Sequence, residues 1–426
     1  MNSRFFRTGP PGPRRSTAGR RAGLTFFCGF VTAMASVAPE SQDLFVGGEG
    51  GYAVYRIPGL VVTANGTALA VCEARRDGPD DWGTMDILLR RSTDGGRNWA
   101  PPRRLAHEGP VVPRSPVALE RKLGQPDDRT VNNPVLIVGR KPGSVVLLYC
   151  VEYARCFVRR SQDDGATFSP PEEITGAFEV LRPVYNWRVL ATGPGHGVAL
   201  RSGRLVVPVW LALGTAGNGH KPSLTTTVYS DDGGVTWKAG SVALPDTAEF
   251  RTPSETCLVE LSDGRVMLNA RSLSPANRRL VTTGPDGAGG WASPWFDPAL
   301  LEPICMASLV RYSTVQSGGR DRILFSNPDN LATSQGKPTR PGQPGARRNL
   351  SIKLSYDEGI TWPVNKVLEL GSSAYSDLAV TADGTILCVF ERTFTDPATR
   401  RRIAALSLAR FTLEWLTDGK DCARIP

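Results

Sequence analysis

The chain has 426 residues, enough for one large domain or two ordinary ones, and a formal net charge of +9. Six arginines and no acidic residue lie within the first 38 residues, so the remaining chain carries only about +3. A charge this small does not indicate a nucleic-acid-binding protein.

The first 38 residues have the pattern of an export signal. A basic stretch ends at Arg20 and Arg21, an apolar run follows as far as Ala38, and small residues before Pro39 offer cleavage sites. We therefore expect a cleaved signal peptide over residues 1–38, an exported protein, and no membrane span after cleavage. An N-terminal anchor is the alternative, although the apolar run is short beside the about 20 residues that cross a bilayer. The arginine pair also permits a twin-arginine route.

Short strands dominate the rest of the chain. Stretches rich in Val, Leu, Ile and Tyr are interrupted by Asn-Gly and Asp-Gly turn signals, as in residues 60–74, 144–161, 204–213 and 257–272. This pattern indicates strands joined as hairpins. Long amphipathic helical runs are absent from the sequence, so the predicted fold class is all-β.

One eight-residue phrase recurs along the chain with the template Ser-x-Asp-x-Gly-x-x-Trp/Phe. The copies are residues 92–99, 161–168, 230–237 and 355–362, with a degenerate copy in 282–291. The copies lie about 50–70 residues apart, or multiples of that, which suits a four-stranded sheet module. Over residues 39–426 this spacing predicts a six-bladed β-propeller of four-stranded antiparallel blades.

The aspartates of this phrase are predicted to support turns. A catalytic acid is needed once, whereas Asp94, Asp163, Asp232 and Asp357 occupy the same position in every copy. Short Ser and Asp side chains accept hydrogen bonds from free backbone N–H groups in tight turns. The chemistry is therefore expected elsewhere.

Outside the repeats, charged residues and one tyrosine stand at strand ends or in turns. They are Arg56, Arg75, Asp80, Asp81, Glu255, Arg271, Arg347, Tyr375 and Glu391. Taken in order, YRIP, the repeated phrase, NAR, R-x-N-L and AYSDL resemble the exo-α-sialidases (neuraminidases) of the bacterial and animal type. In that family the repeated phrase is called an Asp box. The resemblance extends from about residue 45 to about residue 412, and it implies a six-bladed propeller with these residues at its centre.

The resemblance assigns the arginines to substrate binding. The family's triad, which binds the carboxylate of sialic acid, corresponds to Arg56, Arg271 and Arg347. Arg75 corresponds to an additional arginine beside the catalytic acid, where the family contacts ring substituents of the sugar, and Glu391 corresponds to an acid that braces Arg56. Guanidinium groups stay charged and bind carboxylates through paired hydrogen bonds, which fits an acidic sugar.

The resemblance also assigns the catalytic groups. Tyr375 corresponds to the nucleophile, Glu255 to its partner and Asp81 to the acid, with Asp80 as the alternative. A neutral phenol approaches the substrate carboxylate without the repulsion that a carboxylate nucleophile would meet, and Glu255 can take its proton. Asp81 would protonate the leaving oxygen and later activate water. Sialidases are a known exception to the two-carboxylate scheme of glycosidases, and double displacement through tyrosine retains the anomeric configuration.

The remaining expectations concern cofactors, partners and the acyl pocket. The three histidines, His107, His196 and His220, have no metal-binding spacing, so we expect neither a cofactor nor a metal. His196, in GPGHGV, is expected to be part of loop structure. Relatives carry Asp before Pro where this chain reads Asn132-Asn133-Pro134, which leaves acyl preference open. The expected partners are sialylated glycans and not nucleic acid, and the expected state is a monomer.

Three other functions remain open at this stage. A sialic-acid-binding propeller without turnover would not need the set formed by Tyr375, Glu255 and Asp81. A transferase or intramolecular trans-sialidase would share these residues and differ only in the acceptor. An Asp-box glucan hydrolase would use paired carboxylates and have no need of the arginines.

Overall fold

The structure is a computed structural model that describes residues 37–106, 112–317 and 319–423. The predicted signal peptide lies outside the described residues except for its last two positions, and His107 lies outside them as well. In the described ranges, no helix is both long enough and apolar enough to cross a bilayer.

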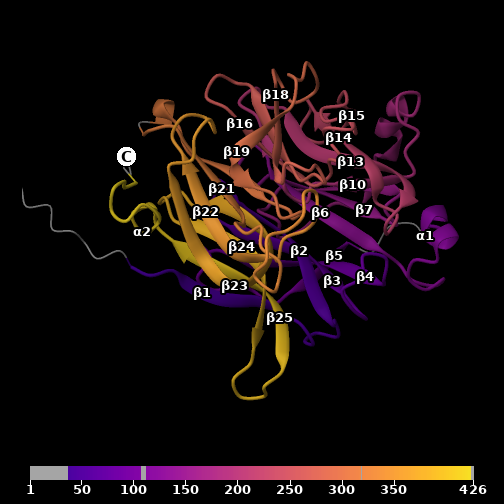
Figure 1. Cartoon of the computed structure of the whole chain (residues 1–426). Helices are drawn as coiled ribbons and strands as arrows, with labels where there is room; N and C mark the ends of the chain where they lie inside the picture. The colour runs from indigo at the N-terminus through magenta and orange to yellow at the C-terminus, as the bar shows by residue number, and fades with distance from the viewer. Residues whose placement is uncertain (1–36, 107–111, 318, 424–426) are drawn as a thin grey trace, which may run out of the picture. The chain divides into compact units, whose positions relative to one another are not determined.

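Five sheets contain the strands of these ranges (Figure 1). Neighbouring strands pair antiparallel, except that β11 pairs parallel with β6. The first sheet consists of β2 (Val54–Val62), β3 (Ala68–Arg75), β4 (Met85–Ser92) and β5 (Arg103–Ala106). The second consists of β6 (Val131–Val138), β7 (Val145–Val151), β8 (Arg155–Ser161), β9 (Glu172–Glu173) and β11 (Gly195–His196).

The third and fourth sheets follow in the chain. The third consists of β10 (Val189–Thr192), β12 (Val198–Ala199), β13 (Leu205–Ala216), β14 (Lys221–Ser230) and β15 (Lys238–Ala239). The fourth consists of β16 (Thr256–Glu260), β17 (Val266–Ala270), β18 (Arg278–Gly284) and β19 (Trp295–Leu301). Helical structure in the described ranges is limited to α1 (Pro116–Arg121), α2 (Leu413–Leu416), η1 (Thr175–Leu181) and η2 (Val315–Ser317). The all-β prediction is confirmed.

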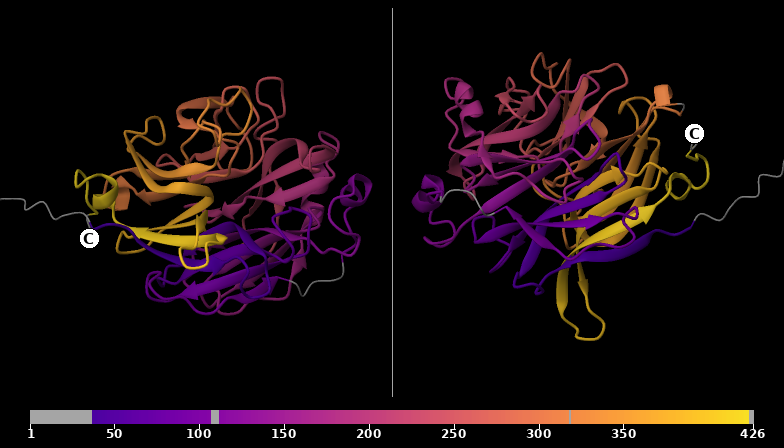
Figure 2. Two further views of the ribbon diagram at one scale, coloured as in Figure 1. Left: turned by 60° about the horizontal axis from the view of Figure 1, so that its bottom comes forward. Right: turned by 180° about the vertical axis from the view of Figure 1, so that it is seen from behind.

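The fifth sheet has seven strands and joins the two ends of the fold. Its strands, in spatial order, are β1 (Glu40–Val46), β25 (Arg402–Phe411), β24 (Ile386–Thr395), β23 (Val364–Val380), β22 (Arg348–Ser355), β21 (Arg322–Pro328) and β20 (Ser308–Ser313). Strand β1 pairs with β25, so the first described strand lies beside the last, as both views of Figure 2 show.

Strand β23 is the reason that five sheets occur where six blades were expected. Its first part, Val364 to Ser372, pairs with β22, and its second part, Ser372 to Val380, pairs with β24. One continuous 17-residue strand therefore belongs to two sets of four strands. The topology consists of open sheets, so the six-bladed propeller stays a prediction.

Each Asp box forms a tight turn held by its own side chains. In the first, Ser92 Oγ donates to Asp94 Oδ1 at 2.7 Å and accepts from the backbone N–H of Gly96 at 2.9 Å. Asp94 also accepts from the backbone N–H groups of Arg97 and Asn98. The boxes at Asp163, Asp232 and Asp357 repeat the bridge from Ser to Asp. The aspartates therefore support turns.

The degenerate copy lacks this bridge for a simple reason. Gly284 stands where the template has Ser, so there is no hydroxyl to join the aspartate to the turn. Asp286 still accepts from the backbone N–H of Ala288 at 3.0 Å. Trp291 packs against Gly284, where a Cβ would meet the indole ring at 2.6 Å. The aromatic position of the box is thus retained.

Candidate active site

Six of the residues expected in the site line one pocket of about 150 Å³. They are Arg56, Asp81, Glu255, Arg271, Arg347 and Tyr375. They come from strands β2 and β23 and from segments next to β3, β16, β17 and β22. The pocket therefore gathers side chains from three of the five sheets.

Tyr375 lies against a carboxylate and a guanidinium. Its hydroxyl donates to Glu255 Oε1, and Nη1 of Arg271 donates to the same hydroxyl at 2.8 Å and to Glu255 Oε2 at 2.6 Å. Burial and then Glu255 raise the pKa of Tyr375 well above its ordinary value. Burial opposes ionisation of Glu255, but Arg271 and the phenol hold the pKa of Glu255 below its usual range. At neutral pH the pair is a phenol beside a carboxylate, which is the arrangement that a base-activated nucleophile needs.

The three arginines surround this phenol. The guanidinium carbons of Arg56 and Arg347 lie 5.1 and 5.3 Å from the centre of the Tyr375 ring, and Arg271 contacts its hydroxyl. Arg56 donates from Nε to Glu391 Oε1 at 3.1 Å. The charges of the three arginines therefore converge on the space next to Tyr375.

The three positive charges are only partly balanced. Arg271 has Glu255 and Arg56 has Glu391 as carboxylate partners. Arg347 forms no ion pair with a carboxylate among the described residues, and its Nη2 donates to the backbone oxygen of Ile304 at 2.8 Å. Buried charge without a partner is costly, so this pocket favours an anionic ligand.

Glu391 lies behind Arg56 and also ties the backbone of two strands. It accepts from the backbone N–H of Ile57 at 3.0 Å and from that of Tyr375 at 3.4 Å. The carboxylate thus fixes Arg56 and Tyr375 relative to each other. Its place agrees with a bracing role and not with contact to a ligand, because Glu391 does not line the pocket.

Asp81 also lines the pocket. Its Oδ1 accepts from Nη1 of Arg75 at 3.0 Å, and Nη1 of Arg56 lies 3.8 Å away. Burial acts to raise the pKa of Asp81, but Arg75, His220 and Arg56 together lower it to about 2. Asp80 is exposed and does not line the pocket, so the geometry selects Asp81 between the two.

Arg75 lies beside Asp81, as the resemblance implied, but behind it and away from the pocket. It is 1% exposed, does not line the pocket, and donates to Glu73 Oε2 at 3.0 and 2.6 Å as well as to Asp81. Glu73 in turn accepts from the backbone N–H of Asn133 at 2.8 Å. Arg75 therefore acts on Asp81 from behind, and its contact with a sugar stays a prediction.

Sequence reasoning missed the hairpin between β13 and β14. Asn218 Nδ2 donates to Asp81 Oδ2 at 2.9 Å, and His220 Nδ1 lies 4.0 Å from the same oxygen. The hairpin is held over Asp81 because the indole N–H of Trp82 donates to the backbone oxygen of Asn218 at 2.6 Å. No motif marks Asn218 or His220 in the sequence, since their partner lies more than 130 positions earlier.

Aromatic rings enclose His220. The ring centres of Tyr153, Trp210 and Trp82 lie 4.5, 5.1 and 5.5 Å from that of His220. Burial lowers the pKa of His220 to about 4, so this histidine is neutral at neutral pH. Tyr153, Trp210 and His220 line the pocket and give it an aromatic wall beside the charged one, and Asn133 lines it as well.

Comparisons with known proteins find sialidases among the relatives of this chain. The BNR repeat-like domain family matches residues 86–388. A sialidase of Micromonospora viridifaciens is 34% identical over 395 residues, which cover 90% of this chain and 55% of that protein. A sialidase of Bacteroides fragilis is 30% identical over 370 residues, which cover 81% of this chain and 61% of that protein. The chain thus spans less than two thirds of either relative.

A solved structure is similar over a comparable range. The Hadza microbial sialidase Hz136 matches with a TM-score of 0.68 and 25% sequence identity, over 88% of this chain and 69% of that chain. The family match includes all four full Asp boxes, since all of them lie between residues 86 and 388. The chain belongs to the BNR repeat-like domain family, and the two relatives named above are sialidases.

Proposed function

We propose that the chain is a retaining exo-α-sialidase that hydrolyses terminal sialic acid from glycoproteins, glycolipids or oligosaccharides. The observation on which this rests is the phenol of Tyr375, hydrogen-bonded to Glu255 and surrounded by three arginines. Relatives named sialidases in bacteria support the same activity. Sialylated glycans are the proposed binding partners.

In the first step, Arg56, Arg271 and Arg347 bind the carboxylate on the anomeric carbon. Tyr375 attacks that carbon as Glu255 takes the phenol proton. The bond to the leaving oxygen breaks, and Asp81 gives that oxygen its proton. The product of this step is a sialic acid joined to the Tyr375 oxygen.

In the second step, water replaces the leaving group. Asp81, now a carboxylate, takes a proton from the water as its oxygen attacks the anomeric carbon. The bond to Tyr375 breaks, and Glu255 returns the proton to the phenolate. Two inversions at one carbon retain its configuration.

The low pKa of Asp81 in the free site is consistent with this scheme once substrate is bound. The substrate carboxylate would offset the charge of Arg56, one of the groups that lower the pKa of Asp81. The sugar would also exclude water from the acid, which favours its neutral form. Both effects raise the pKa of Asp81, so we propose that binding itself prepares the acid.

We also propose that the sheets form six four-stranded blades. The first part of β23 would complete one blade with β20–β22, and the second part would begin the next with β24, β25 and β1. The other four sheets supply the remaining blades. Such a ring would bring β2, β16 and β23 to one axis, which accounts for the meeting of their residues.

The proposal includes export and a monomeric state. Residues 1–38 would be removed as a signal peptide, which rests on the basic stretch and apolar run of the sequence. A protein exported in this way would meet sialylated glycans outside the cytoplasm. Mass spectrometry of the secreted protein would identify its first residue.

Hydrolysis of a fluorogenic α-sialoside, followed by NMR, tests the proposed activity. We expect α-sialic acid to appear first and then to mutarotate, as retention requires. Initial β-sialic acid would contradict the Tyr375 mechanism. If the folded protein binds the sialoside without turnover, it is a binding propeller. Release of anhydro-sialic acid would identify an intramolecular trans-sialidase. Transfer of sialic acid to added lactose would identify a transferase.

A further inference from the structure

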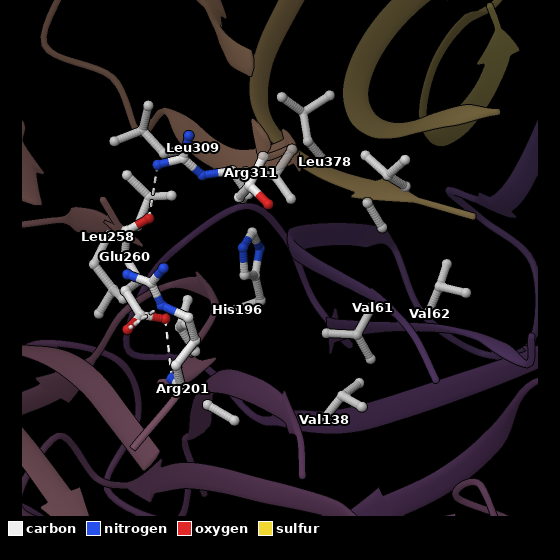
Figure 3. A pocket seen from close by; sticks show the side chains of 18 of the residues that line it. Val61, Val62, Val138, His196, Arg201, Leu258, Glu260, Leu309, Arg311 and Leu378 are labelled. Atoms are coloured by element: carbon white, nitrogen blue, oxygen red, sulfur yellow. Dashed lines mark hydrogen bonds and ion pairs between the residues drawn. The ribbon is translucent and has the colours of Figure 1, made fainter. Parts of the chain in front are cut away.

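A second cavity lies at the other end of the strands that form the pocket. It has a volume of about 770 Å³, and its lining is largely aliphatic, with Leu60, Leu258, Leu309 and Leu378 among its residues. On β2, Arg56 lines the pocket and Leu60 lines the cavity; on β23, Tyr375 lines the pocket and Leu378 lines the cavity. Figure 3 shows His196 among these aliphatic side chains. Short spans of the same strands thus connect the two sites.

Next to this cavity, one buried carboxylate joins four strands. Asp377, on β23 and 1% exposed, accepts from the backbone N–H of Leu60 on β2 at 2.7 Å. It also accepts from Ser308 Oγ on β20 at 2.7 Å and pairs with His196 Nδ1 on β11 at 2.8 Å. Ser308 Oγ accepts in turn from the backbone N–H of Leu378 at 3.1 Å. The position of β23 is therefore fixed from three sides at Asp377.

Close packing at this point requires glycine. A Cβ on Gly195, whose φ is +99°, would lie 2.8 Å from Met306 Cε and 3.3 Å from Asp377 Oδ1. A Cβ on Gly59 would lie 2.7 Å from the backbone oxygen of Gly195. The backbone of β11 thus runs against both Asp377 and β2, which brings the His196 ring to the carboxylate.

Tyr375 stands two residues before Asp377 on the same strand, β23. The ladder between β23 and β24 is irregular there, because the register shifts between Ser373 and Ser376. Tyr375 therefore lies in a bulge, where regular pairing does not set its direction, and bulges next to active sites commonly aim a side chain. Its backbone N–H donates to Glu391 at 3.4 Å. The ties at Asp377 fix the strand on the other side of the bulge.

The contact between His196 and Asp377 favours the protonated imidazole. Burial acts to lower the pKa of His196, but Asp377 outweighs it and raises that pKa above the ordinary value. Other charged groups lining the cavity already have partners: Arg201 pairs with Glu260, and Arg311 with Glu358. Two buried thiols near Asp377, those of Cys257 on β16 and Cys388 on β24, have raised pKa values and are neutral, mainly through burial.

We propose that His196 and Asp377 are positioning residues for Tyr375, holding its strand so that the phenol points at the anomeric carbon. The proposal rests on the proposed sialidase function. It gives a role to a histidine that the catalytic steps leave unused. Because His196 also lines the second cavity, the imidazole can exchange protons with solvent that enters this cavity, and its protonation follows the pH of that solvent.

Two substitutions of His196 separate the hydrogen bond from the charge. His196→Leu removes both, and we expect kcat to fall about 10- to 100-fold, because a small displacement of a reacting group has effects of that size. KM should change less than about twofold, since the arginines are untouched. His196→Asn keeps a donor near the place of Nδ1, so it should recover most of kcat below neutral pH.

The pH profile is a second readout. In the wild type the ion pair weakens as pH rises through the raised pKa of His196, and kcat should decline there. The asparagine of His196→Asn does not titrate, so kcat of this variant should not decline as pH rises through the pKa that His196 has in the wild type. Hydrogen exchange of the amides in residues 375–380 should be at least about tenfold faster in His196→Leu.

Asp421→Asn is the matched control, because it breaks another buried ion pair, with Arg322, outside both cavities. It should lower stability and leave kcat and its pH profile unchanged. The inference would be overturned if the pH profiles of wild type and His196→Asn overlapped, or if Asp421→Asn lost as much kcat as His196→Leu. Either result would leave the proposed function standing. If His196→Leu does not fold, the pH profile and the amide hydrogen exchange of His196→Asn still test the inference. A wild type without sialidase turnover would instead overturn the proposed function, and the inference with it.

Discussion

The hydroxyl of Tyr375 donates a hydrogen bond to the carboxylate of Glu255, a residue 120 positions earlier in the chain. Burial raises the pKa of the phenol, so free phenolate does not form at neutral pH. The pKa of Glu255 is lowered, so its carboxylate is available as a base. Transfer of the phenol proton to Glu255 must therefore accompany the attack of Tyr375 on the anomeric carbon. Removing the hydroxyl removes both the nucleophile and the group from which Glu255 takes the proton.

The first prediction concerns this hydroxyl. Tyr375→Phe should lower kcat by at least about a thousandfold, because loss of a nucleophile removes the covalent route. Affinity for a sialic acid analogue, measured by calorimetry, should change little, since the arginines remain. Tyr55→Phe, which removes another buried hydroxyl bonded to the backbone of Glu49, is the control and should keep wild-type kcat. Equal turnover in Tyr375→Phe and wild type would exclude Tyr375 as nucleophile.

The second prediction concerns recognition of the carboxylate. Arg347 lacks a carboxylate partner among the described residues, so an anionic ligand would supply one. Arg347→Lys should weaken binding of a sialic acid analogue by about 10- to 100-fold, because the paired hydrogen bonds of a guanidinium are lost. Calorimetry measures this loss. The adjacent and exposed Arg348→Lys should bind as the wild type does, and a carboxamide analogue should bind both variants alike.

The third prediction tests the hairpin over the acid. Asn218 donates to Asp81 at 2.9 Å, which favours the ionised acid. Asn218→Ala should therefore raise the pKa of Asp81 above about 2, as followed by NMR titration of its carboxyl carbon. It should also lower kcat/KM about fivefold through loss of orientation. Asn65→Ala breaks a similar pair with Asp164 in an exposed turn and should leave both quantities unchanged. A pKa of Asp81 that does not move would remove this role.

The fourth prediction concerns stability at acidic pH. The hydroxyl and N–H groups of each box lower the pKa of Asp163 and of Asp232 to about 2. Because these values lie below those of the unfolded chain, the stabilisation is present above about pH 4 and is lost as pH falls towards about 2. Asp163→Asn and Asp232→Asn should flatten this part of the stability curve, measured by urea unfolding. Asp80→Asn, at an exposed aspartate outside the boxes, should leave the curve as it is.

The same boxes should respond to loss of the serine. Ser230 Oγ joins Asp232 to the backbone N–H of Gly234. Ser230→Ala leaves both groups without that partner and should lower the free energy of unfolding by about 1 kcal/mol. Unchanged stability in Ser230→Ala would contradict the turn-support role of the box.

The turn role of the Asp boxes could be predicted from sequence because every hydrogen bond involved spans four residues or fewer. The residues of the pocket could be predicted from the ordered motifs YRIP, NAR, R-x-N-L and AYSDL, which resemble those of sialidases. The choice between Asp80 and Asp81 could not be made in that way, since neighbours in a turn point in different directions. Only the fold places Asp81 against Arg75 and leaves Asp80 exposed.

Other features depended on contacts between distant strands. Asn218 reaches Asp81 across 137 positions, and His196 reaches Asp377 across 181. The continuous β23 joins two sets of strands that the repeat spacing treats as separate. By itself the sequence determined the strand-rich class, the turns and the chemical types at the site, because these depend on neighbours along the chain. The tertiary structure decided which side chains meet, because that depends on how strands far apart in sequence pack and pair.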